Sequence, residues 1–153
     1  MPAVNIDGKI LGQAGAILQY VADKYPEFGA GDGELARFEF NEVMNFLTGD
    51  FHPAFWPYFV PSRFTVSKDE EQIEAVRQAS FARIDRVLTH LDSLIGDGVH
   101  VYQDKRTVAD AYAFVMVRWA GKLEKSWEQY PNVARFMQAM NDDEAVKYVL
   151  QNS

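Results

Sequence analysis

The sequence contains no cysteine among its 153 residues. This absence excludes disulfide bonds, thiolate nucleophiles and cysteine-based metal sites within the chain. Lys and Arg are not concentrated in any stretch and the formal net charge is −7, so nucleic acid and anionic membranes are poor candidates as partners. No apolar run approaches the length of a membrane span, and no secretion signal is recognisable. These absences favour a soluble protein of the cytoplasm.

Apolar and aromatic residues, by contrast, are plentiful. They make up 48% and 14% of the chain, which argues against disorder. A chain of this length can bury roughly 68–70% of the surface that its unfolded form exposes, enough for a proper core. His90 and His100 have no partners at metal-ligand spacing, so we predict no metal site.

The first 26 residues follow a strand, turn, strand and helix pattern. Residues 2–6 and 9–11 are typical of short strands, and the Asp-Gly pair between them favours a tight hairpin turn. From Ala14 the apolar residues recur with helical spacing. The helix is expected to end at Tyr25, because Pro26 restricts the residue before it.

Glycines at residues 29–33 indicate a linker, and every long segment after it has helical periodicity. A helix is expected over residues 34–59, interrupted at Pro53 and Pro57. Ser67 and Glu70 have the spacing of a capping box at the start of a long amphipathic helix that Gly96 would end.

A second capping box precedes the least polar helix of the chain. Thr107 and Asp110 have the required spacing, and Asp110 is the only charged residue in the stretch from 109 to 117. A helix that is apolar on all sides is normally the centre of a bundle. Pro131 suits the first position of a further helix. The pattern therefore predicts a mainly α fold, an all-helical bundle preceded by a hairpin and one helix.

Two stretches carry a resemblance to a known family. "GQAGAILQYVADKYP" is similar to the third helix of glutathione transferases and the turn before it, and "TVADAYAF" resembles the capping box and buried sixth helix of the same family. The bacterial, beta-class members are the most similar. The resemblance implies that residues 1–28 are a remnant of the thioredoxin-like domain, 29–33 the linker and 34–153 the helical C-terminal domain.

The resemblance also implies that the first strand–helix–strand and second helix of the thioredoxin-like domain have no counterpart in these 153 residues. In the family that part supplies the catalytic Tyr, Ser or Cys. Met1 and Pro2 fall where the family has its cis-proline, at the start of the third strand, so the resemblance makes both residues glutathione contacts. Without the preceding strand, residues 2–6 would present a bare edge, which we expect a second copy of the chain or the terminus to cover.

Gln13 and Ala14 occupy the position where the family holds the γ-glutamyl end of glutathione. The family has an acidic residue or Gln there, followed by a small residue that usually carries a hydroxyl, which Ala14 lacks. A free helix N-terminus also suits a carboxylate on physical grounds. The alternative is a plain helix start without a ligand.

Asn45 and His52 are seven residues apart and would share one face of a continuous helix. Beta-class transferases are similar here, with the His facing glutathione. The resemblance makes Asn45 a glutathione contact and His52 an auxiliary catalytic residue that polarises the thiol. The alternative is a His at a helix break that is bonded to a freed carbonyl.

An aromatic run follows His52. The resemblance implies that it lines the pocket for a hydrophobic electrophile, and packing in the core or in a dimer contact is the alternative. The residues are Phe55, Trp56, Tyr58 and Phe59. For Thr107 and Asp110 we favour a structural N-cap over acid–base chemistry.

Two functions remain open from the sequence. One is a homodimeric glutathione transferase that conjugates glutathione to electrophiles and is catalytically incomplete in this chain. The other is a non-catalytic module of the same family that acts through protein–protein contacts.

Overall fold

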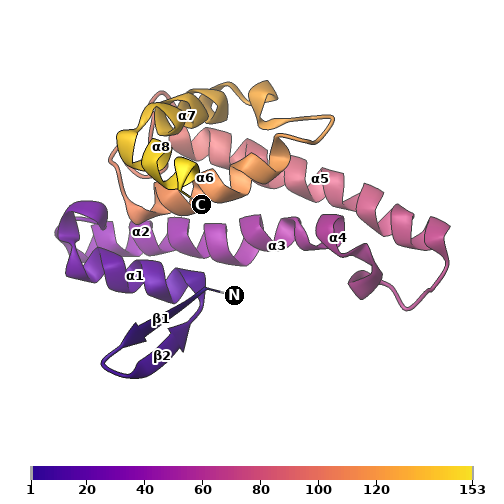
Figure 1. The fold of residues 1–153 in the computed structure, drawn as a ribbon. Coiled ribbons are helices and arrows are strands. Elements are labelled where there is room, and N and C mark those ends of the chain that lie inside the picture. Colours follow the sequence, from indigo (N-terminus) through magenta and orange to yellow (C-terminus); the bar gives the residue numbers. More distant parts are fainter. Residues whose placement is uncertain (1, 153) are drawn as a thin grey trace.

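The computed structural model of the protein describes residues 2–152 and consists mainly of helices (Figure 1). Two strands and a helix come first, and helices follow. The elements are β1 (Ala3–Ile6), β2 (Lys9–Gly12), α1 (Ala14–Lys24), α2 (Glu34–Asn45), α3 (His52–Ala54), α4 (Trp56–Phe59), α5 (Glu70–Ile95), α6 (Val108–Ala120), α7 (Pro131–Asp142) and α8 (Glu144–Gln151). Short 3₁₀ turns lie at Pro26–Phe28, Pro61–Phe64 and Trp127–Gln129, and a π-helix at Phe46–Phe51. The predicted fold class is confirmed.

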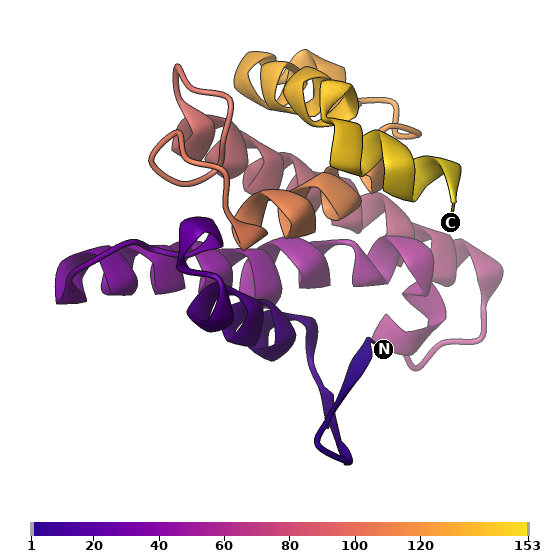
Figure 2. The same cartoon turned by 60° about the vertical axis from the view of Figure 1, so that its left-hand side comes forward.

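The hairpin forms as its turn residues predict. β1 and β2 pair antiparallel, with Ala3 opposite Gly12 and Ile6 opposite Lys9. Asp7 and Gly8 have φ of 50° and 81°, as a two-residue turn of the primed type requires. The hairpin projects from the helical body in Figures 1 and 2. Within residues 2–152 the sheet has no third strand, so each strand keeps one unpaired edge.

The glycine-rich segment at 29–33 is irregular and joins α1 to α2. Gly31 and Gly33 have φ of 85° and 108°, a conformation that residues with a side chain rarely adopt. The Lys105 ammonium donates a hydrogen bond to the carbonyl oxygen of Gly29 at 3.2 Å, which fixes the start of the segment. The division into units at 1–28 and 34–153 stays a prediction.

Helices α2, α3 and α4 form one row across the molecule (Figure 1). Interruptions were predicted at the two prolines, but the first change comes earlier, in the π-helix at Phe46–Phe51. Pro53 has no N–H to donate to the carbonyl of Gly49, so the α-helical bonding pattern cannot continue there. The π-helix replaces the α-helical turn immediately before that proline.

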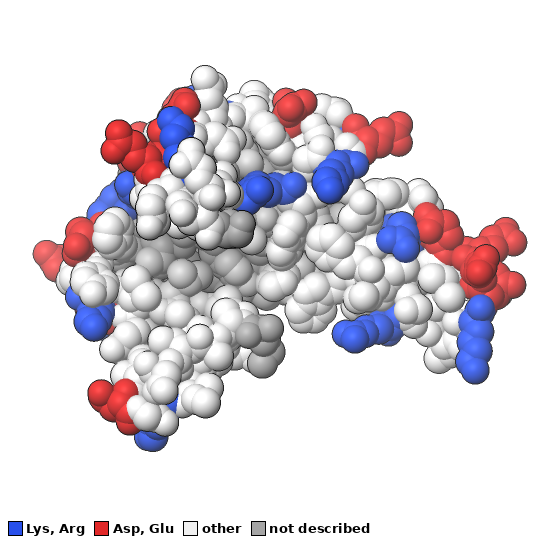
Figure 3. Space-filling model, in the orientation of Figure 1, with Lys and Arg blue, Asp and Glu red and all other residues white. Residues whose placement is uncertain are grey.

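The long helix α5 starts two residues later than the capping box predicts. Its N-cap is Asp69, whose carboxylate accepts from the N–H groups of Glu71 and Gln72. The Ser67 hydroxyl instead accepts from the N–H of Asp69 in the preceding turn. Acidic side chains gather at this end of α5 (Figure 3), where the helix dipole is positive. Gly96, with φ of 55°, ends the helix as predicted.

Helix α6 lies at the centre of the bundle and contacts α1, α7 and the π-helix. In Figures 1 and 2 it lies between the α2–α4 row and α7. Its buried residues are Val108, Ala109, Asp110, Ala113, Phe114, Met116, Val117 and Ala120. Within residues 2–152, no helix has the length and apolar character needed to cross a bilayer.

Candidate functional site

A cavity of about 360 Å³ lies where the start of α1 meets α2 and the π-helix. Gln13 precedes α1 with φ of 71°, an uncommon conformation for a residue other than glycine. Its side chain does not cap the helix, and only its carbonyl accepts, from the N–H of Ile17. The N–H groups of the first turn therefore have no helical partners. The cavity is lined by Gln13, Gly15, Ala16, Gln19, Met44, Asn45 and Thr48.

Gly15 allows α1 to approach the π-helix closely. A Cβ atom at Gly15 would lie 2.9 Å from the methyl carbon of Thr48, closer than real Cβ contacts allow. The Thr48 hydroxyl donates to the carbonyl of Met44 at 2.8 Å, so this side chain is fixed. This contact sets the position of Gln13 over the cavity.

Asn45 also lines this cavity, and its amide donates to the carbonyl of Asn41 at 2.7 Å. The Asn41 side chain accepts from Gln19 at 2.7 Å, which links α1 to α2. Pro2 lies beside Gly12, one residue before Gln13. Met1 lies outside the described residues.

The structure does not place His52 with Asn45 on one continuous helix face. That prediction assumed an unbroken α-helix and is wrong, because the π-helix lies between the two residues. His52 does not line the cavity of Gln13 and Asn45, and it turns toward α6. Its Nδ1 lies 2.7 Å from the hydroxyl of Tyr112.

Burial shifts both groups of this hydrogen-bonded pair toward their neutral forms. It lowers the pKa of His52 and raises the pKa of Tyr112. At neutral pH the pair is therefore an uncharged imidazole and an uncharged phenol.

An aromatic surface surrounds His52. His52, Trp56 and Phe59 recur at helical spacing along α3 and α4, and Trp119 of α6 packs beside them. The Trp119 ring centroid lies 5.2 Å from that of His52 and 5.3 Å from that of Phe59. Trp56 and Phe59 are each 47% exposed. We call His52, Trp56, Phe59, Tyr112 and Trp119 the aromatic face.

The aromatic face contains two of the four predicted pocket residues. Phe55 is fully buried and packs on Phe51 in the core, so its predicted place in an acceptor pocket is wrong. Tyr58 turns to α5, where it packs on Phe81 and where the Arg77 guanidinium lies over its ring. Trp56 and Phe59 stay accessible.

Sequence reasoning missed Tyr112 and Trp119. Both are on α6, seven residues apart, and therefore share one face of that helix. The spacing was visible in the sequence, but it did not reveal that this face meets His52.

The Thr107 and Asp110 side chains form a reciprocal capping box at the start of α6. The Asp110 carboxylate accepts from the N–H of Thr107 at 2.6 Å and from that of Val101 at 2.9 Å. His100 Nδ1 lies 3.5 Å from this carboxylate, but it makes no hydrogen bond within residues 2–152. Burial raises the pKa of Asp110. These contacts give Asp110 a structural task within the fold.

Comparisons with known proteins place this geometry in a family. A family model described as "Glutathione S-transferase, C-terminal domain" matches residues 74–139. "Glutathione S-transferase GST-4.5" of Xanthomonas campestris pathovar campestris is 31% identical over 153 residues, a match that covers 99% of this chain and 74% of that protein. The chain belongs to the glutathione S-transferase family.

Solved structures agree with this assignment. A beta-class glutathione S-transferase of Sphingomonas chungbukensis is 29% identical with a TM-score of 0.80, and the match covers 99% of this chain and 73% of that one. A sphingomonad glutathione S-transferase complexed with glutathione is 26% identical with a TM-score of 0.81 over the same shares. The resemblance to bacterial transferases is confirmed.

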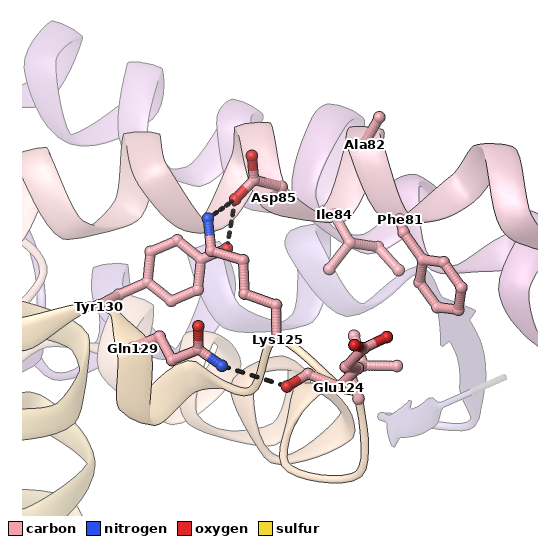
Figure 4. A pocket seen from close by; sticks show the side chains of 9 residues that line it. Phe81, Ala82, Ile84, Asp85, Glu124, Lys125, Gln129 and Tyr130 are labelled. Atoms are coloured by element: carbon pink, nitrogen blue, oxygen red, sulfur yellow. Dashed lines mark hydrogen bonds and ion pairs between the residues drawn. The ribbon is translucent and has the colours of Figure 1, made fainter.

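Another cavity, of about 480 Å³, lies between α5 and the segment before α7 (Figure 4). Asp85 accepts there from Lys125 and, at 2.6 Å, from the hydroxyl of Tyr130. The hydrogen bond from Lys125 is the largest cause of the lowered pKa of Asp85. Burial, together with the hydrogen bond that Tyr130 donates to Asp85, raises the pKa of Tyr130 to about 12. Asp85, Lys125 and Tyr130 therefore bind one another and tie two segments of the fold together.

Among residues 2–152, no three His, Asp or Glu side chains are arranged to hold a metal ion.

Proposed function

We propose that this chain binds glutathione by its γ-glutamyl end in the cavity beside Gln13. The observation that carries the proposal is the uncapped N-terminus of α1 at that cavity. Free N–H groups and the positive end of the helix dipole stabilise a carboxylate. The amides of Gln13 and Asn45 offer further donors, and Ala14 offers only its N–H. Pro2, which lies beside Gly12, would border the bound tripeptide.

The glutathione complex of the sphingomonad relative supports this proposal. In this proposal glutathione is the substrate, and no metal ion takes part.

The aromatic face is the proposed position of the hydrophobic electrophile. Trp56 and Phe59 expose flat apolar surface, and Trp119 packs beside them. Ligand sites are commonly lined by aromatic side chains with a few polar groups among them. His52 is the polar group at this face, and we assign it an auxiliary role in the conjugation.

In the conjugation, the glutathione sulfur forms a bond to an electrophilic carbon and a leaving group departs with its electron pair. The thiol proton must first be removed. Neutral His52 could accept it, but the 153 residues contain no cysteine to assist. We therefore propose that the chain by itself is catalytically incomplete. The alternative, a non-catalytic interaction module of the same family, is favoured by the uncharged state of His52 and Tyr112.

The glutathione proposal is tested by replacing Gln13 with Ala. Loss of a hydrogen bond to a charged ligand group should weaken glutathione binding by about tenfold or more. Isothermal titration calorimetry of the purified chain measures the affinity. Gln138→Ala, at an exposed position of α7, is the matched control and should bind as the parent does. Equal affinity of Gln13→Ala and parent, or a parent without binding at millimolar glutathione, would contradict the proposal.

We also propose that the chain is a cytoplasmic homodimer. The cysteine-free composition suits a reducing compartment. The exposed edges of β1 and β2 offer unpaired backbone groups, and Ile10 beside them is 79% exposed. Such edges pair readily with a second chain.

Replacing Val4 with Lys should weaken this dimer. A lysine on an edge strand opposes strand pairing, because its charge would have to be desolvated between the two copies. We expect the dimer dissociation constant to rise about tenfold or more in sedimentation velocity experiments. Gln138→Lys supplies the same charge away from the hairpin and should leave dimerisation unchanged. A monomeric parent, or a Val4→Lys variant that dimerises like the parent, would exclude the edge as the interface.

A further inference from the structure

A groove of about 370 Å³ runs between α6 and α8 and shares no lining residue with the cavity of Gln13. Its walls are largely apolar. Val115 and Val149 are 47% and 58% exposed, so the groove is open to solvent. In Figure 3 the surface over α6 and α8 is mostly uncharged, with basic side chains near the C-terminal end of α6. The apolar wall consists of Phe114, Val115, Met140, Val146, Val149 and Leu150.

The two ends of the groove differ in charge. At one end Arg106 forms a 2.8 Å ion pair with Asp143, the N-cap of α8, so this guanidinium is neutralised. At the other end lies Arg118, whose side chain makes no hydrogen bond or ion pair within residues 2–152. It lies 5.8 Å from the ring centroid of Phe114. Within residues 2–152 the groove therefore has an unpaired cation only at the Arg118 end, roughly 17 Å along α6 from Thr107.

We propose that this groove binds a small amphipathic carboxylate, such as a medium-chain fatty acid. Arg118 would hold the carboxylate through two parallel hydrogen bonds, and the apolar tail would lie between α6 and α8. The cavity volume is near the lower end of the range for ligand pockets, which suits a single alkyl chain. The site is separate from the proposed glutathione cavity.

The lining of the groove argues for a small amphipathic anion as the occupant. One carboxylate meets the guanidinium of Arg118, which residues 2–152 leave unpaired, and an alkyl chain matches the apolar wall. The carboxylate also leaves the Arg106–Asp143 pair intact.

The probe is decanoate, added to the full chain below the concentration at which it forms micelles and followed by calorimetry and by amide chemical shifts. We expect shifts on α6 and α8. Arg118→Gln should weaken decanoate binding about tenfold or more but leave binding of the neutral decan-1-ol unchanged. Val149→Glu, at an exposed site, should weaken binding of both probes. Arg83→Gln removes one charge from α5 and serves as the matched control.

Several results would overturn the proposal. The first is that millimolar decanoate causes no chemical-shift changes on α6 and α8. The second is that Arg118→Gln and Arg83→Gln weaken decanoate binding equally. The third is that Val149→Glu changes the oligomeric state and leaves the affinity for decanoate unchanged. Gln13→Ala should bind decanoate like the parent, so failure of the glutathione proposal is distinguishable from failure of this one. Circular dichroism of each variant checks that it is folded.

Discussion

Replacement of Asp110 by Ala is expected to lower the free energy of unfolding by about 3 kcal/mol or more. The carboxylate accepts from two backbone N–H groups, those of Thr107 and Val101. Both residues are buried, so neither donor could turn to water after the substitution. A buried donor without a partner costs about 1–3 kcal/mol, and two are created here.

Urea denaturation of the parent and Asp110→Ala measures this loss. Asp69→Ala is the matched control, because Asp69 also accepts from two backbone N–H groups at a helix start, but at an exposed position. Water can replace that cap, so we expect a loss of about 1 kcal/mol. Equal losses in the two variants would mean that burial of the Asp110 network adds nothing.

The carboxyl group of Asp110 should also make the free energy of unfolding depend on pH. Burial raises the pKa of Asp110 in the folded chain, so folding favours its protonated form. The stability that it contributes is present below the unfolded pKa of about 3.9 and is lost as the pH rises through the folded pKa. Asp110→Asn does not titrate. The difference in unfolding free energy between parent and variant should therefore vary with pH from about 4 up to the folded pKa of Asp110 and be constant above it.

Local chemistry was sufficient to predict several elements. The Asp7-Gly8 pair determines a turn by the conformations that these residues accept, and Gly96 ends α5 for the same reason. The reciprocal bonds of Thr107 and Asp110 involve residues three positions apart, so sequence spacing alone can suggest them.

Competition between neighbouring residues was harder to predict. Ser67 and Asp69 are both good N-caps, and Asp69 takes the position because Ser67 serves the turn before it. The periodicity of apolar residues does not reveal the π-helix before Pro53. The chain adapts to the hydrogen bond that Pro53 cannot donate several residues earlier, at Phe46–Phe51. That shift separates His52 from Asn45.

The residues of the candidate site also fall into two groups, those that local sequence features identify and those whose position depends on contacts between distant parts of the chain. Gln13 was singled out by the family resemblance of the stretch around it and by its place at a predicted helix start, and both are local features of the sequence. Tyr112 was missed because its contact with His52 joins residues 60 positions apart. Phe55 was misplaced because the aromatic run lies at a helix break, where the sequence does not show which rings face α5, α6 or solvent.

We expect the 153-residue chain to show almost no conjugation of 1-chloro-2,4-dinitrobenzene, at most about tenfold above the uncatalysed rate at saturating glutathione. A free thiol has a pKa near 8.5, so only about 3% is thiolate at pH 7. A nearby positive charge would raise this fraction. Burial lowers the pKa of His52 and raises that of Tyr112, so neither group supplies a charge or a strong acid at this pH.

The expected result for His52→Ala follows from the same geometry. General-base help is typically worth 10²–10⁴-fold, but only when the reacting thiol is held within hydrogen-bond reach. His52 and Gln13 do not line a common cavity, so we expect His52→Ala to reduce the rate less than tenfold. Stopped-flow absorbance of parent, His52→Ala, Gln13→Ala and the Gln138→Ala control measures this. Turnover above about 1 s⁻¹ in the parent that collapses in His52→Ala or Gln13→Ala would show a complete catalytic site and disprove the proposed incompleteness.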